Sequence, residues 1–392
     1  MCRLAALVTA AVLVAACSSG TNDHPEEDAA RSTTTGATTT TTDPADAVVY
    51  PGDEWERADP AEMGFDPAAL DAVAATAEEL DSTCFLVTRR GRIVGEWYWD
   101  GDDASSTHEV FSVTKSFTST LVGMAQADGD LSIEESASTY VDEWVGTDAE
   151  AVTIRNLLSN DSGREWSLGL DYVELPRAAD RDQFAIDLGQ QYPPGEAWSY
   201  NNAAIQTLDR VLSTATGEVT ADYAASRLFA PLGMDDTGMT ADPSGNSTNA
   251  FFGLQSTCED LARFGYLFLR EGAWDGEQIV PAEWVEEATG APSQEHNAAY
   301  GFLWWLNTEG RLLGPLQAVT PTEEPEEVIG QIAPGAPEDM YTAQGLGGQI
   351  VMVDPGSETV VVRLGAGPAG APTEGFRAQE AARVLTDALV DE

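Results

Sequence analysis

The sequence predicts an α+β fold: an antiparallel sheet built from both chain ends and flanked by helices, with an inserted, mainly helical domain. Segments rich in β-forming residues occur near the start of the folded part and again near the end of the chain. Helical patterns fill most of the region between them. Because strands from both ends then share one sheet, the helical region, at about 130–256, is expected to be an insertion.

The first expected elements are a helix, a hairpin and a second helix. An Asp-Pro pair supplies the N-cap and first-turn proline of a helix over 66–80. Two β-rich runs, 85–88 and 93–99, flank an Arg-Gly turn and predict paired strands. Apolar residues at helical spacing then predict a helix over 112–127, which Gly129 closes.

Residues from about 130 to 270 are expected to be mostly helical. The stretch opens with a capping-box pattern, Ser132-x-x-Glu135. Apolar periodicity predicts longer helices over 203–215 and 257–270.

Strand signals return in the last third of the chain. The run 300–307 is aromatic and β-prone, and 349–354 with 359–364 flank a Pro-Gly turn as a second hairpin. A last helix is expected over 375–389. The acidic, proline-rich stretch 309–339 fits a lid and a solvated insertion equally well.

The first 48 residues have the composition of an export signal followed by a linker. A short apolar run, below the roughly 20 residues that span a bilayer, predicts a signal peptide over 1–16. It ends in a Val-Ala-Ala-Cys sequence that resembles the bacterial lipobox, so Cys17 is expected to carry a lipid anchor on the extracytoplasmic face; an ordinary secretory signal is the alternative. Residues 17–48 are Thr-rich and predicted to be disordered, which leaves 49–392 as the folded domain.

The charge balance excludes one class of partner. The chain has 66 acidic residues against 19 Lys and Arg, a formal net charge of −47. Such a surface repels phosphate, so nucleic acid is not expected to bind.

Cysteine and histidine are too few and too scattered to indicate a metal centre. The chain lacks CxxC and HExxH patterns and has three separate His, so no metal and no other cofactor is expected. Cys84 and Cys258 fall in the folded domain. In an exported protein they could form a disulfide or stay as buried thiols, and the sequence does not decide between the two.

Lysine occurs once in the chain, at position 115. Ser112 precedes it by three residues, and positions i and i+3 share one face of a helix. A serine becomes nucleophilic when a base takes its proton, which a lysine of lowered pKa can do and an arginine cannot. The pair therefore predicts a nucleophile, Ser112, and its base, Lys115.

A second element supplies a further proton-transfer group. Tyr200 and Asn202 form a Tyr-x-Asn pattern shortly after a Pro-Gly pair in the helical region. A shifted pattern, Ser199-x-Asn201, is the alternative, and the spacing from Gly195 favours Tyr200.

With the segments 157–163 and 345–349, these motifs resemble the serine β-lactamase and penicillin-binding-protein superfamily, class C-like branch, over roughly residues 50–392. Residues 111–118 and 345–349 look most like the 6-aminohexanoate-dimer hydrolase and carboxylesterase relatives. The resemblance implies a two-part fold with the site between the sheet and the helical domain.

The resemblance also implies a mechanism. Ser112 would form an acyl-enzyme with a small-molecule or peptide-like ester or amide, with Lys115 and Tyr200 as proton-transfer groups. Asn202 would orient Lys115 and the substrate. The backbone N–H groups of Ser112 and of Leu346, which follows Gly345, would form the oxyanion hole.

The third motif of the superfamily departs from its usual pattern. A Lys or His normally precedes the glycine on the strand beside the site, whereas this chain has Ala343-Gln344-Gly345. The missing cation weakens a penicillin-hydrolysing or cell-wall transpeptidase role and leaves esters and amides that need no carboxylate. A β-lactamase or D-amino-acid peptidase is the alternative enzyme. A non-catalytic cell-envelope binding lipoprotein on the same fold is the rival from another class.

Three tryptophans, Trp166, Trp304 and Trp305, could line a substrate cleft. A place in the hydrophobic core is favoured for them.

Overall fold

The computed structural model describes residues 48–366 and 375–390. The predicted signal peptide, Cys17 and nearly all of the linker lie outside these ranges. Within them, no helix is both long enough and apolar enough to span a membrane.

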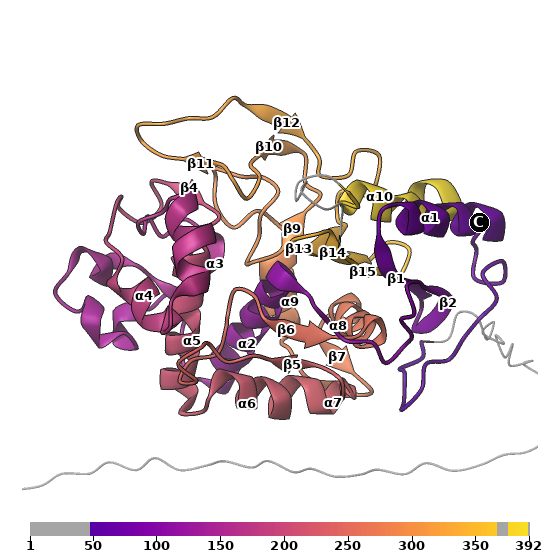
Figure 1. The fold of residues 1–392 in the computed structure, drawn as a ribbon, viewed down its shortest axis with the longest axis horizontal. Coiled ribbons are helices and arrows are strands. Elements are labelled where there is room, and N and C mark those ends of the chain that lie inside the picture. Colours follow the sequence, from indigo (N-terminus) through magenta and orange to yellow (C-terminus); the bar gives the residue numbers. More distant parts are fainter. Residues whose placement is uncertain (1–47, 367–374, 391–392) are drawn as a thin grey trace, which may run out of the picture. The chain divides into compact units, whose positions relative to one another are not determined.

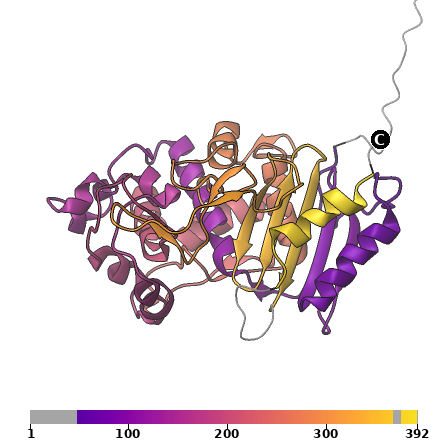
Figure 2. The ribbon, with the colours of Figure 1, turned by 90° about the horizontal axis from the view of Figure 1, so that it is seen from above.

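A six-stranded sheet joins the two ends of the described chain. Its order is β2-β1-β15-β14-β13-β9, and every neighbouring pair is antiparallel. Figure 2 shows the strands of the N-terminal hairpin beside those of the C-terminal hairpin. The predicted fold class is therefore confirmed. The strands are β1 (Ser82–Arg89), β2 (Arg92–Tyr98), β9 (Trp305–Leu306), β13 (Tyr341–Gly345), β14 (Gln349–Asp354) and β15 (Thr359–Gly365).

Helices cover both faces of this sheet, and the side chains of its strands alternate between them. On one face, α1 (Pro67–Glu79) and α10 (Ala378–Arg383) pack with Phe85 and Met352. On the other, α8 (Cys258–Leu269) contacts β1, β14 and β15. Both faces are apolar, so the sheet is buried on two sides.

The helical region between the hairpins consists of short elements (Figure 1). Its helices are α2 (Thr114–Asp128), α3 (Ile154–Ser159), α4 (Arg181–Asp187), α5 (Asn202–Thr216), α6 (Thr220–Ala224), α7 (Ala230–Leu232) and, beyond α8, α9 (Ala282–Thr289). Short strands outside the main sheet are β3 (His108–Glu109), β4 (Trp198–Ser199), β5 (Gly238–Met239), β6 (Leu254–Ser256), β7 (Ala273–Trp274), β8 (Glu277–Gln278), β10 (Gly310–Leu312), β11 (Ala318–Val319) and β12 (Val328–Gly330).

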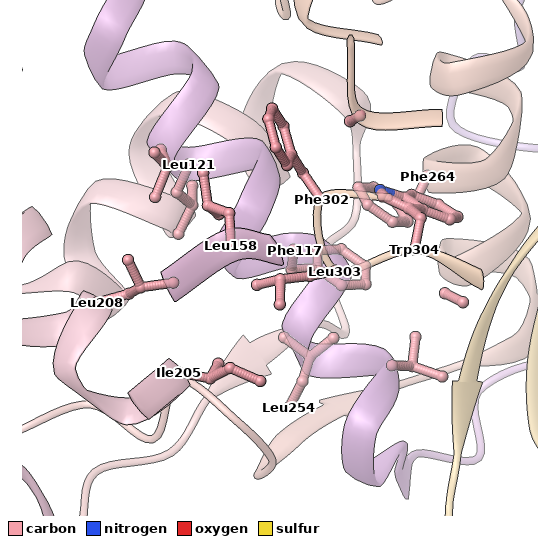
Figure 3. Close-up of a cluster of buried hydrophobic side chains, with 14 of the residues drawn as sticks. Phe117, Leu121, Leu158, Ile205, Leu208, Leu254, Phe264, Phe302, Leu303 and Trp304 are labelled. Atoms are coloured by element: carbon pink, nitrogen blue, oxygen red, sulfur yellow. The ribbon is translucent and has the colours of Figure 1, made fainter. Parts of the chain in front are cut away.

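Helix α2 is the centre of the molecule's larger core. Every residue from Thr114 to Ala125 is buried, the polar ones included. The ring of Phe117 stacks on Phe264 with centroids 3.7 Å apart, and Phe264 in turn stacks on Trp304 (Figure 3). Because α2 is surrounded on all sides, its position is fixed by packing rather than by helix propensity.

A disulfide joins the sheet to α8. Cys84 in β1 is bonded to Cys258 at the first residue of the helix, with Cα atoms 6.6 Å apart. The bond links residues 174 apart in sequence and thereby restrains the unfolded chain.

Two local predictions were wrong. Residues 132–135 form a turn instead of the start of a helix, although Ser132 Oγ does accept a bond from the backbone N–H of Glu134. The β-prone run 300–307 contributes only the two residues of β9, because the chain bends at Gly301 and Leu303 has a positive φ of 61°.

Candidate active site

Ser112 lies in a tight turn between β3 and α2. The turn is a single 3₁₀ segment, η2 (Phe111–Val113), and Phe111 has a φ of 48°, a left-handed conformation that is unfavourable for a bulky residue. Such strain persists where the surrounding structure enforces it. The turn leaves Ser112 half-buried, whereas the helix that follows is buried from Thr114 to Ala125.

Lys115 points from α2 to the hydroxyl of Ser112. Its Nζ donates hydrogen bonds to Ser112 Oγ at 2.7 Å and to the carbonyl of Phe251 at 2.8 Å. The residue is only 1% exposed, and burial lowers the pKa of Lys115 to about 7, against the attraction of Asp171, which raises it. A substantial neutral fraction is therefore present near pH 7.

Tyr200 reaches the same oxygen from the helical region. Its hydroxyl is hydrogen-bonded to Ser112, and its ring centroid lies 4.8 Å from Lys115 Nζ. The ring stacks on Trp305 with centroids 5.6 Å apart. Burial raises the pKa of Tyr200 well above its usual value, so the hydroxyl keeps its proton at neutral pH. The two predicted proton-transfer groups, Lys115 and Tyr200, thus meet at one atom, the Oγ of the predicted nucleophile Ser112.

The residues after Tyr200 serve different purposes. Asn201 caps α5, since its side chain accepts a bond from the N–H of Ala204. The side chain of Asn202 is hydrogen-bonded to Tyr172, and its amide oxygen has no partner among the described residues. The structure gives Asn202 no hydrogen bond to Lys115, so the orienting role expected for it is not seen in these contacts.

The carbonyl that holds Lys115 belongs to a segment, 248–253, that is fixed by buried side chains. Gln206 donates to the Thr248 carbonyl at 2.8 Å and accepts from the Ala250 N–H at 3.0 Å. Thr118 on α2 donates to the Ala250 carbonyl at 2.7 Å. These bonds set the place of Phe251, and with it the second acceptor of Lys115.

Two buried carboxyls support the same segment. Asp209 accepts from the Thr248 N–H at 2.8 Å, and Asp182 accepts from the Gln206 amide at 2.6 Å. Burial raises the pKa of both carboxyls, and repulsion by Asp209 raises that of Asp182 further.

The turn after β13 brings Gly345 and Leu346 next to Ser112's turn. A Cβ at Gly345 would collide with the carbonyl of Val110, so only glycine allows this approach. Within the described residues, the N–H of Leu346 bonds no other backbone group. Gln349 donates to the Leu346 carbonyl at 3.1 Å, which holds the next peptide of the turn.

The position of the superfamily's usual cation is filled by an apolar residue. Ala343 is 1% exposed and belongs to the same core cluster as Phe117. Gln344 donates to the hydroxyl of Thr342 at 2.8 Å.

The tryptophans divide between core and site. Trp304 is fully buried against Phe264 and Phe268, as favoured. Trp305 stacks on Tyr200, and the indole N–H of Trp166 donates to the Tyr200 carbonyl at 3.1 Å.

The stretch 309–339 lies beside the site. Its strand β11 pairs with β4, the strand that directly precedes Tyr200, and the carbonyl of Pro315 accepts a bond from Tyr172 at 2.9 Å (Figure 1). These contacts place the stretch against the helical region, as a lid requires.

No group of three or more His, Cys, Asp or Glu is placed to hold a metal ion in the described ranges. A hollow of about 900 Å³ lies on α9, and none of Ser112, Lys115 and Tyr200 lines it.

Sequence reasoning missed Asp171, the carbonyl of Phe251 and Gln206. A backbone carbonyl has no residue signature, and the two side chains act through contacts with residues far away in the chain. The one available signal for Asp171 was its place between the Leu157–Gly163 motif and Tyr200, which is too weak to single it out.

Comparisons with known proteins agree with this geometry. The Beta-lactamase family model matches residues 70–386. The chain is 25% identical over 349 residues to the 6-aminohexanoate-dimer hydrolase of Paenarthrobacter ureafaciens, covering 80% of this chain and 81% of that protein.

Solved structures share the fold. A putative 6-aminohexanoate-dimer hydrolase from Bacillus anthracis superposes with a TM-score of 0.60 at 22% identity, over 80% of this chain and 79% of that one. A putative beta-lactamase from Bacteroides dorei gives 0.65 at 18% identity, over 82% and 97%.

Replacing Gln206 with Leu should lower the free energy of unfolding by about 1–3 kcal/mol, because buried polar groups at Asp182, Thr248 and Ala250 lose their partner. Urea denaturation followed by tryptophan fluorescence measures the change. Gln183→Leu on neighbouring α4 is the control, since the side chain of Gln183 donates to Asp187 near the surface and its backbone bond to Asp180 is kept in the variant. Equal losses in both variants would contradict the role assigned to Gln206.

Proposed function

The chain belongs to the Beta-lactamase family, and on this premise we propose that it cleaves ester or amide bonds through an acyl-enzyme on Ser112. One observation carries the proposal: Ser112 Oγ lies 2.7 Å from the chain's single lysine nitrogen and is hydrogen-bonded to Tyr200 as well. A nucleophile with a deprotonatable base in reach is what acyl transfer requires.

In the first step, Ser112 Oγ bonds to the substrate carbonyl carbon while its proton passes to Lys115, directly or through Tyr200. The carbonyl π electrons move to the oxygen, and the N–H groups of Ser112 and Leu346 stabilise the resulting oxyanion. The intermediate then expels an alcohol or amine, which leaves with a proton from Tyr200, and the proton held by Lys115 replaces it on Tyr200.

In the second step, a water molecule attacks the acyl-enzyme. Its proton passes to Lys115, directly or through Tyr200, and then to Oγ as the carbon–Oγ bond breaks, which releases the acid and restores the Ser112 hydroxyl. Both steps need Lys115 to gain and lose a proton near neutral pH, and its pKa of about 7 matches that requirement.

The proposed substrate class rests on the residues near Ser112. Ala343 supplies no cation for a substrate carboxylate, and the buried ring of Tyr200 stacks on Trp305. We therefore propose small esters and amides that need no carboxylate. The similarity to a protein named for hydrolysis of the 6-aminohexanoate dimer supports the amide part of this proposal.

We also propose that the protein is exported and anchored by a lipid on Cys17. Incorporation of labelled palmitate into the full chain, and its loss in Cys17→Ala, would support the anchor; equal labelling of both would contradict it.

Replacing Ser112 with Ala should abolish covalent labelling by a fluorophosphonate, because the nucleophile is gone. Lys115→Arg should reduce the labelling rate at least about 100-fold, since the charge is kept but the base is lost. Mass spectrometry of the intact protein measures both.

Ser119→Ala is the control, because Ser119 lies buried on the same helix and its hydroxyl has no hydrogen-bond partner among the described residues. It should label like the wild type. If the wild-type protein is never labelled, the rival function, a non-catalytic binding protein, is favoured. If Lys115→Arg is labelled as fast as the wild type, Lys115 is not the base.

On a substrate panel, short-chain p-nitrophenyl esters or linear aminohexanoate amides should be hydrolysed, and nitrocefin should be turned over at least about 100-fold less efficiently, as the missing cation predicts. Comparison of kcat/KM values tests this. Efficient nitrocefin hydrolysis would point to a β-lactamase instead, and turnover of D-peptides alone would point to a D-amino-acid peptidase.

A further inference from the structure

Asp171 is a buried carboxylate that the proposed mechanism does not use. It lies in a short π-helical turn, η6 (Leu170–Glu174), and is 1% exposed. It forms no direct salt bridge with a described arginine or lysine. An unpaired carboxylate is costly to bury, so the groups that compensate it indicate its purpose.

Its two oxygens bind the start of α5. Oδ2 accepts from the N–H of Asn202 at 2.8 Å, and Oδ1 accepts from the N–H of Ala203 at 3.0 Å. These peptides directly follow Tyr200. Both oxygens are thus used to fix the backbone that carries the Tyr200 hydroxyl to Ser112, and the helix end favours the negative charge.

Trp166 strengthens the same connection. Its indole is hydrogen-bonded to Asp171 and also donates to the carbonyl of Tyr200. Three successive peptide groups after Tyr200 are therefore held by η6 and by Trp166, which precedes it.

Asp171 is also the carboxylate whose charge acts on Lys115. Burial lowers the pKa of Lys115, and the attraction of Asp171 opposes that effect. The other titratable groups around the two are Tyr200 and Tyr172, and burial raises the pKa of both tyrosines, so they stay neutral. With Asp171 uncharged, burial alone would make Lys115 a weaker base.

We propose that Asp171 is a positioning residue, which holds Tyr200 on Ser112 through the first turn of α5 and whose charge sets the pH range in which Lys115 accepts the serine proton. The inference rests on the proposed acyl-enzyme function. It assigns to one side chain both the geometry of the proton-transfer group and the basicity of the base.

The test is the pH dependence of fluorophosphonate labelling in the full chain. Labelling should rise with pH as Lys115 loses its proton, and Asp171→Asn should move the midpoint of that rise down by about one pH unit. Its plateau rate should fall about tenfold, because the base is weaker and Tyr200 is held by fewer bonds. Asp180→Asn, which removes the charge of the N-cap of α4, is the control and should keep both values.

A second variant, Asp171→Glu, separates the effect of the hydrogen bonds to α5 from the effect of the negative charge on Lys115. It also provides a test if Asp171→Asn does not fold. The charge stays but the carboxylate lies one methylene further out, so the midpoint should stay at its wild-type value while the plateau falls. A wild-type midpoint in a folded Asp171→Asn, or a wild-type plateau in Asp171→Glu, would overturn the inference. Absence of Ser112-dependent labelling in the wild type would instead refute the proposed function itself.

Discussion

The burial of one ammonium group governs how the rest of this structure is arranged. Lys115 lies inside α2, a helix whose residues are buried from Thr114 to Ala125. Removing a charged amine from water is costly, and the cost is reduced either by hydrogen-bond acceptors or by loss of the proton. The fold supplies two acceptors, Ser112 Oγ and the Phe251 carbonyl. Burial lowers the pKa of Lys115 and the charge of Asp171 raises it, which together place the pKa at about 7.

The groups around Lys115 come from segments far apart in the chain. Gln206 and Thr118 fix the segment that carries Phe251, and Asp171 fixes the peptides after Tyr200. The helical region therefore provides the proton-transfer groups. The sheet provides the turn at Leu346, where Gln349 holds the Leu346 carbonyl and where β13 lies next to the nucleophile's turn. Each part of the α+β architecture thus has a separate task at the site.

The sequence was sufficient to predict the features that depend on local spacing. Ser112 and Lys115 are three residues apart and are joined by a hydrogen bond. Each of the two hairpins is indicated by a turn between two β-rich runs. The sequence could not reveal the Phe251 carbonyl, because any residue presents one. The capping-box pattern at Ser132 failed because tertiary contacts, including the bond from the Ile133 N–H to Gln126, hold that stretch in a turn. Trp304 and Trp305 are neighbours of the same type, and the sequence did not show that Trp304 packs against Phe264 in the core while Trp305 stacks on Tyr200.

The most direct measurement is the pKa of Lys115 itself. Because the chain contains a single lysine, protein labelled with ¹³C-lysine gives one Cε resonance, whose chemical shift can be followed against pH by NMR. The structure predicts a midpoint near 7, because burial favours the neutral amine. A midpoint near 10.5, the value of an exposed lysine, would mean that the amine stays protonated at neutral pH and cannot be the base.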